Sequence, residues 1–175
     1  MNLPSALPVS KSSAPSGSAL LNSADAARVD ALIGAHRDMP GALLPLLHAV
    51  QQALGHVPGA AVPAIAQGLG LSRAEVHGVI TYYHFFRQAP AGRHVVQVCR
   101  AEACQACGGE ALLAQAEQLL GCASHSTRSD GAVTLEPVYC LGLCASSPAL
   151  QINHKLHARV TPQRLASLVA ELEGL

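Results

Sequence analysis

Apolar residues return with a helical period through the first half of the chain, over residues 24–88. In the clearest run the apolar positions are three or four residues apart: Leu43, Leu47, Val50 and Leu54. Pro40 is expected to open this helix and Gly55 to end it, because proline is tolerated in a first helical turn and glycine favours a helix end. A preceding helix, capped by Asp25, completes the start of a predicted helical bundle.

Two further helices follow in the same segment. The apolar positions of Val62–Leu69 predict a short helix that ends at Gly70. Ser72 and Glu75 form a capping-box pair before the next helix, a feature that stabilises a helix by about 1 kcal/mol. We expect that helix to carry residues 81–86, where four of the five aromatic residues of the chain lie. Such a run either packs the bundle against the next domain or forms a partner-binding face.

After a short linker at residues 89–92, the spacing of apolar residues changes to a pattern of strands and helices that is typical of a mixed α/β fold. The expected strands are 94–99, a segment through 133–135, and a hairpin of 150–153 with 156–160. The expected helices are 110–120 and one that begins at Pro162. This order predicts a small α/β sandwich of the thioredoxin type, in which helices cover a mixed sheet.

These patterns divide the chain into three parts. Residues 1–23 are rich in Ser, Pro and Ala and are predicted to be a flexible tail. Residues 24–88 form the helical bundle, and residues 92–175 form the α/β domain. The predicted fold class is therefore α/β, with an N-terminal helical bundle before a thioredoxin-like domain.

Composition narrows the range of partners. Only 13% of the residues are charged and the formal net charge is zero, which argues against nucleic-acid binding and against a polybasic membrane contact. The sequence offers no apolar run near the ~20 residues of a membrane helix and no convincing secretory signal, so a cytoplasmic location is expected. In a reducing compartment structural disulfides are rare, and six cysteines need another explanation.

The cysteine spacing predicts a four-thiolate site. Cys99 ends a predicted strand and Cys104 follows it, while Cys140 and Cys144 follow another strand about forty residues later. Loops at strand ends are where a scaffold brings ligands together, and Gly142 allows a sharp turn between the second pair. Four thiolates bind either zinc or an iron–sulfur cluster. A zinc-stapled interaction module is therefore an alternative of another class.

Two other interpretations use Cys107. With Cys99 and Cys104 it matches the ligand spacing of plant-type ferredoxins, in which case Cys140 or Cys144 is spare. It also forms a Cys-x2-Cys pair with Cys104, typical of a thiol oxidoreductase. No Ser-His-Asp grouping or phosphate-binding loop is evident, so we expect a chain that is not catalytic by itself and binds no nucleotide alone.

A family resemblance rests on four segments. They are Val98-Cys99-x4-Cys104, Asp130-Gly131-x-Val133-Thr134-Leu135, Val138-Tyr139-Cys140-Leu141-Gly142-Leu143-Cys144 and, in the helical half, Gly78-Val79-x-Thr81-Tyr82-Tyr83. Together they resemble the thioredoxin-like [2Fe–2S] subunit of respiratory complex I and its relatives, over about residues 25–173. The resemblance implies a [2Fe–2S] cluster on four ligands: Cys99, Cys104, Cys140 and Cys144. It leaves Cys107 and Cys122 outside the ligand set, as small, partly buried side chains.

The resemblance also implies a partner. In the family a neighbouring subunit carries FMN and binds NAD, and relatives occur in complex I, in NAD-linked hydrogenases and in NAD-dependent molybdenum formate dehydrogenases. The segment Cys99–Gln105 is most similar to the gamma subunit of the formate dehydrogenases, which implies a molybdenum-containing catalytic subunit as well. Backbone N–H groups of residues 100–103 and 141–143 are the expected hydrogen-bond donors around the cluster, and Arg100 is the nearest charge.

Overall fold

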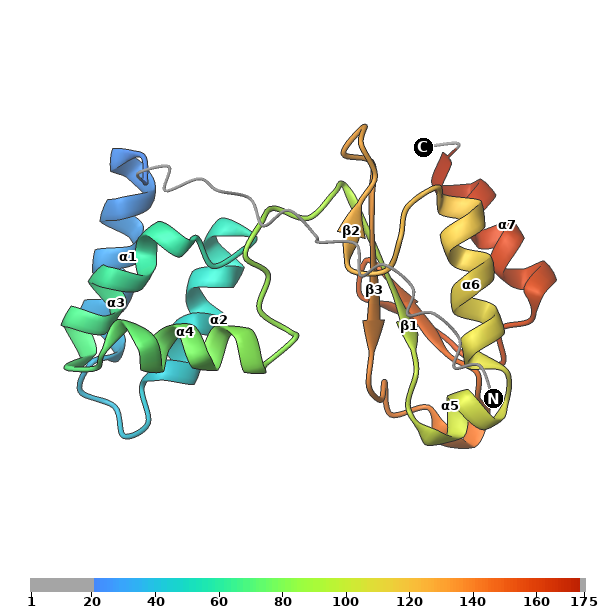
Figure 1. Cartoon of the computed structure of the whole chain (residues 1–175), viewed down its shortest axis with the longest axis horizontal. Coiled ribbons are helices and arrows are strands. Elements are labelled where there is room, and N and C mark those ends of the chain that lie inside the picture. Colours follow the sequence, from blue (N-terminus) through green and yellow to red (C-terminus); the bar gives the residue numbers. More distant parts are fainter. Residues whose placement is uncertain (1–20, 174–175) are drawn as a thin grey trace, which may run out of the picture.

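The computed structural model describes residues 21–173 and places its elements in two parts that lie side by side (Figure 1). Within these residues, the first part holds α1 (Ser23–His36), α2 (Leu43–Leu54), the 3₁₀ turn η1 (Gly59–Ala61), α3 (Val62–Leu69) and α4 (Arg73–Tyr82). The second part holds β1 (His94–Cys99), α5 (Glu102–Ala106), α6 (Gly109–Leu120), β2 (Ser126–Thr127), β3 (Val133–Val138), the 3₁₀ turn η2 (Cys144–Ser146), β4 (Leu150–Ile152), β5 (Lys155–His157) and α7 (Pro162–Glu173). Residues 1–20 of the predicted tail lie outside the described residues, and α1 already begins at Ser23.

The helical part has a core of its own, in which the fully buried side chains include Val29, Leu46, Leu47, Val50, Ile65 and Val76. The predicted capping box is confirmed: the Glu75 backbone N–H donates to Ser72, and the Ser72 backbone N–H donates to the Glu75 carboxylate. Gly55 and Gly70 follow the ends of α2 and α3, as expected.

Two predicted helix starts are wrong. The first helix is capped by Asn22, whose side-chain oxygen accepts from the backbone N–H of Asp25, so Asp25 lies in the first turn. The second helix begins at Leu43 and not at Pro40, because the chain turns through Gly41 at a φ of 68° before the helix can start.

The aromatic run does not stay on a helix. α4 ends at Tyr82, and Tyr83 is already extended. The side chain of Gln51, buried inside the bundle, donates to the carbonyl of Phe85 at 2.8 Å and accepts from the backbone N–H of Arg87 at 2.7 Å. These bonds satisfy backbone groups outside any helix and explain why the chain leaves α4 here.

The second part is built on a mixed five-stranded sheet of order β2-β3-β1-β4-β5. The central pair β1 and β3 is parallel, and the other neighbours are antiparallel. The predicted hairpin is confirmed, but its second strand ends at His157, and the two-residue strand β2 was not predicted. The observed class is therefore mixed α/β, with N-terminal helices before a sheet-and-helix domain of thioredoxin type.

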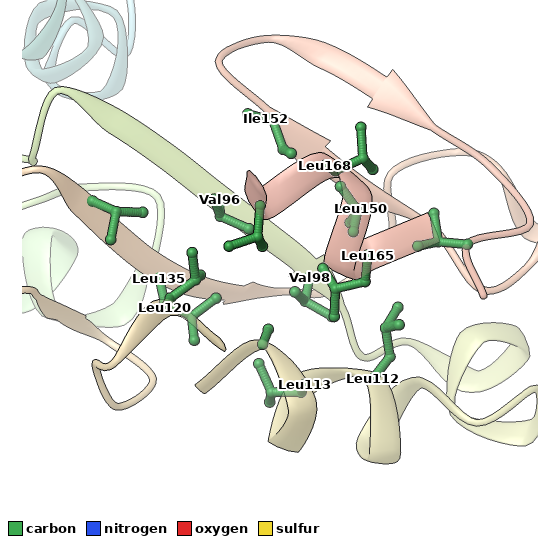
Figure 2. Close-up of a cluster of buried hydrophobic side chains, with 14 residues drawn as sticks. Val96, Val98, Leu112, Leu113, Leu120, Leu135, Leu150, Ile152, Leu165 and Leu168 are labelled. Atoms are coloured by element: carbon green, nitrogen blue, oxygen red, sulfur yellow. The ribbon is translucent and has the colours of Figure 1, made fainter. Parts of the chain in front are cut away.

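The two faces of this sheet differ. α6 and α7 cover one face, where they pack on Val96, Val98, Leu135 and Leu150 (Figure 2). The opposite face, toward the helical part, carries the alternate side chains, which include Val95 and Val138 and four polar residues: Gln97, Thr134, Glu136 and Gln151. The sheet is thus apolar on one side and largely polar on the side that meets the helices.

An ion pair joins the two parts across that polar face. The guanidinium of Arg87, just after α4, donates to both carboxylate oxygens of Glu136 on β3, and its Nη2 lies 3.0 Å from Glu136 Oε2. Gln97 donates to the same Oε2 at 2.8 Å and itself accepts from Gln151. The pair therefore ends a chain of side-chain hydrogen bonds that runs across the three central strands.

Candidate metal centre

The parallel pairing of β1 and β3 brings the two cysteine segments together. In the register Cys99 at the end of β1 lies opposite Val138 at the end of β3, and Cys140 follows two residues later. Because carboxyl ends of parallel strands meet at one edge of a sheet, both cysteine pairs leave the sheet at the same place. Figure 1 shows β1 running into α5 at this end.

The first pair is buried. Cys99 and Cys104 are each 2% exposed and pack with Ala149 in a small cluster of their own. Cys104 was expected on a loop, but it lies in the five-residue helix α5. The start of α6 packs closely against this segment: a Cβ at Gly109 would stand 2.8 Å from the Cys104 carbonyl oxygen. Only glycine permits that approach.

The second pair lies at the surface. Cys140 and Cys144 are both exposed, and their sulfur atoms are 3.7 Å apart. Two thiolates on one tetrahedral metal, with bonds of about 2.3 Å, stand about 3.8 Å apart. Gly142, at a φ of 77°, turns the chain between them and donates its backbone N–H to Cys140 Sγ at 3.4 Å. Cys140 itself has a φ of 87°, a conformation that costs a non-glycine residue about 1–3 kcal/mol.

Hydrogen bonds and neighbouring sulfurs perturb these thiols. Burial alone would raise the pKa of Cys99, but hydrogen bonds to its sulfur outweigh burial and lower that pKa. The groups that make these bonds are the Ala101 backbone, the Cys104 side chain, and the Leu141 and Cys140 backbones. The neighbouring Cys140 sulfur is the main cause that raises the pKa of Cys144, and Cys104 and Cys99 contribute in the same direction. Each pair is therefore within electrostatic reach of the other.

A serine that no sequence motif marked touches both pairs. The hydroxyl oxygen of Ser147 lies 3.4 Å from Cys104 Sγ and donates to the backbone carbonyl of Cys144 at 2.9 Å. A hydroxyl three residues after the last cysteine was the available sequence signal, but Ser147 and Ser146 are equivalent until the fold is known.

The remaining cysteines and Arg100 have surroundings that differ from those of the two pairs. Cys107 is exposed at the end of α5, against the expectation of partial burial, whereas Cys122 is half-buried against the domain core, and burial raises the pKa of its thiol. Arg100 is not a free charge beside the site, because its guanidinium makes three hydrogen bonds to the carboxylate of Glu110 on α6.

A cavity of about 790 Å³ lies between the helical part and the polar sheet face and reaches Cys140. Its walls include Phe85, Arg87, Gln97, Glu136 and Tyr139. The aromatic run divides here: Phe86 is buried in the bundle core, whereas Tyr82, Tyr83 and Phe85 are exposed. The run therefore contributes Phe86 to the bundle core and leaves its other aromatic rings at the surface, so its use as a partner-binding face stays a prediction.

The donor set suits an iron–sulfur cluster. All six cysteines are free thiols, and four of them form the two neighbouring pairs at the sheet edge. Four cysteine thiolates are the usual ligands of a [2Fe–2S] cluster. Among residues 21–173 no group of three or more His, Cys, Asp or Glu side chains has the arrangement to hold a single metal ion. The same range contains no helix that is long and apolar enough to cross a membrane.

Comparison with known proteins identifies relatives over most of the chain. Residues 29–173 match the family model described as thioredoxin-like [2Fe–2S] ferredoxin. The NADH-quinone oxidoreductase E 2 subunit of Rhizobium meliloti is 36% identical over 141 residues, which are 81% of this chain and 84% of the relative. The corresponding E-type subunit of Pseudomonas aeruginosa NADH-quinone oxidoreductase is 37% identical over 134 residues, or 77% of this chain and 81% of that one.

A solved structure shares the fold. A crystal structure of an NAD⁺-reducing [NiFe]-hydrogenase in the H₂-reduced state matches 79% of this chain with a TM-score of 0.63 and 24% sequence identity. The match spans only 23% of the hydrogenase chain, so the chain is similar to a small part of that protein.

Proposed function

Because the chain belongs to the thioredoxin-like [2Fe–2S] ferredoxin family, we propose that it is an electron-transfer subunit that holds one [2Fe–2S] cluster. The proposed ligands are Cys99, Cys104, Cys140 and Cys144. The observation that carries the proposal is the meeting of the two cysteine pairs at one sheet edge, with the outer pair already at the spacing of two thiolates on one metal. In this proposal residues 92–175 form the cluster-binding domain and residues 24–88 a separate helical domain.

The chain supplies ligands, burial and hydrogen-bond donors. A bound [2Fe–2S] cluster accepts and returns one electron, at a potential set by exposure and by hydrogen bonds to the sulfurs. The buried Cys99 and Cys104 lie on a side of the site that excludes water, while the exposed Cys140 and Cys144 leave the other side open to a partner. The backbone N–H of Gly142 lies within the segment expected to supply donors, and it already points at Cys140 Sγ.

The proposed partner is a subunit that carries FMN and binds NAD. The curated relatives are subunits of NADH-quinone oxidoreductases, so they favour an assembly of complex I type, and the fold likeness fits the NAD-linked hydrogenases as a related setting. A formate dehydrogenase, with a molybdenum-containing subunit, is a narrower proposal that rests on the resemblance of Cys99–Gln105 alone. The relatives favour the wider assignment over it.

The first test is the metal content of the full chain, purified without oxygen. We expect two iron and two acid-labile sulfide per chain and little zinc, with the red-brown colour of a [2Fe–2S] protein. One zinc without sulfide, also after anaerobic reconstitution with iron and sulfide, would refute electron transfer and favour the zinc-stapled module.

The ligand set is tested by replacing single cysteines. Cys144→Ser is expected to reduce the bound iron and change the visible and EPR spectra, because it removes one thiolate of the outer pair. Cys107→Ser is the matched control and should leave iron content and spectra as in the wild type. The reverse result would support the plant-type ligand set, in which Cys107 binds iron.

The partner is tested by isolating the tagged full chain from its own cells. Co-purification of a flavin-containing subunit, and reduction of the complex by NADH, are the expected results. Reduction of the same complex by formate would support the narrower formate dehydrogenase proposal. Absence of any flavin subunit, with the cluster intact, would contradict the proposed partner.

A further inference from the structure

We propose that Ser147 raises the reduction potential of the cluster by donating its hydroxyl hydrogen to the Cys104 sulfur. The inference rests on the proposed function, because it concerns a sulfur that is a proposed ligand. It assigns a redox-positioning role to a side chain outside the ligand set.

The geometry makes Ser147 the side-chain hydroxyl that bridges the two ligand pairs. Its oxygen lies 3.4 Å from Cys104 Sγ, within hydrogen-bond range for sulfur, and 2.9 Å from the carbonyl oxygen of Cys144. Cys104 is almost fully buried, so water has little access to its sulfur. The backbone after Ser147 is held in place, because the carbonyl of Pro148 accepts from Val160 and that of Ala149 accepts from Cys99.

The number of hydrogens decides what Ser147 does. When Cys104 is a neutral thiol, its S–H can donate to the Ser147 oxygen while the hydroxyl donates to the Cys144 carbonyl. A metal ligand is a thiolate and has no hydrogen. The single hydroxyl hydrogen then has two acceptors, and a charged sulfur is a stronger partner than a neutral carbonyl.

The direction of the effect follows from the charge on the sulfur. Reduction adds one negative charge to the cluster and its thiolates, so a hydrogen bond to a ligand sulfur is stronger in the reduced state than in the oxidised state. Ser147 therefore favours the reduced state, and its loss should shift the midpoint potential to a more negative value. The burial of Cys104 increases the effect, because few water molecules compete with the hydroxyl.

The test is a redox titration of the loaded full chain, followed by visible and EPR spectroscopy. At the wild-type midpoint, Ser147→Ala should lower the ratio of reduced to oxidised cluster roughly tenfold, because the lost hydrogen bond is stronger when the cluster and its thiolates carry the added negative charge. Ser146→Ala is the matched control, one residue earlier and without a side-chain hydrogen bond to either cysteine pair, and it should leave the midpoint unchanged. Ser147→Thr keeps the hydroxyl and should stay near the wild type, while Ser147→Val, of the same shape, should shift like Ser147→Ala.

Iron and sulfide analysis of each variant separates the two proposals. A wild type without iron and sulfide would refute the proposed function itself. A fully loaded Ser147→Ala with an unchanged or more positive midpoint would refute only the role of Ser147. Loss of iron from both Ser147→Ala and Ser147→Val, with retention in Ser147→Thr, would make Ser147 an assembly residue and also overturn the redox role.

Discussion

Removing the charge of Glu136 should destabilise the folded chain, because it breaks the ion pair between the helical part and the sheet. In Glu136→Gln the side chain keeps its size but can no longer accept from Arg87 with both terminal atoms. The Arg87 and Glu136 side chains are 24% and 18% exposed, so water replaces the lost bonds only in part. Charged hydrogen bonds and partly buried ion pairs of this kind lead us to expect a loss of about 2 kcal/mol in the free energy of unfolding.

The chain offers a matched control for this change. Arg100 and Glu110 form a similar multiply bonded pair, but their side chains are 33% and 46% exposed and both lie in the α/β part. Exposed pairs contribute about 0.2–1 kcal/mol, so Glu110→Gln should cost less than half as much as Glu136→Gln.

The assay is urea unfolding of the full chain, followed by circular dichroism for both variants and the wild type. A double-mutant cycle with Arg87→Met gives the coupling energy of the pair itself. Equal losses for Glu136→Gln and Glu110→Gln, or a coupling energy near zero, would refute the reasoning that this pair fastens the two parts together.

Three further outcomes are expected. Gly109→Ala should lower the free energy of unfolding and weaken iron retention, because its Cβ would stand 2.8 Å from the Cys104 carbonyl oxygen. Gly78→Ala is the control, because open space surrounds this glycine, and it should stabilise α4 by up to about 1 kcal/mol. Urea unfolding and iron analysis measure both variants, and equal stabilities would contradict the clash. Ser72→Ala should lower the free energy of unfolding by about 1 kcal/mol through loss of the helix cap, and a change within error would contradict it. Burial and nearby positive charges lower the pKa of His157 in the folded chain, so the unfolded chain binds a proton at this histidine more readily. The free energy of unfolding should therefore fall as the pH drops below about 6.5. His157→Gln should make that fall with pH less steep, and an unchanged pH dependence would count against the histidine.

Local signals in the sequence predicted much of the fold. The capping box at Ser72 and the glycine after α3 worked because they act through bonds between near neighbours in the chain. The early end of α4 could not be predicted, since it depends on Gln51, more than thirty residues away. α5 was missed because five residues are too few for a helical period to be visible.

At the candidate site, too, some features were marked by the sequence and others depend on contacts between distant residues. Spacing predicted that the segments of Cys99 and Cys140 meet, because strand ends gather ligands, and the parallel strands confirm that they meet. The contacts of Ser147 and the pairing of Arg100 with Glu110 join residues that only the folded chain brings together. No local pattern marks such contacts, so they were outside the reach of the sequence.

The left-handed backbone of Cys140 has a consequence for anyone who engineers this chain. A glycine at this position would relieve the conformational cost, and a single base change converts either cysteine codon into a glycine codon. A library screened only for thermal tolerance or expression yield would therefore tend to enrich Cys140→Gly. The selected variants would be more stable but would lack the Cys140 thiol, one of the two in the exposed pair. Selection for yield in this chain needs a colour or iron readout beside it.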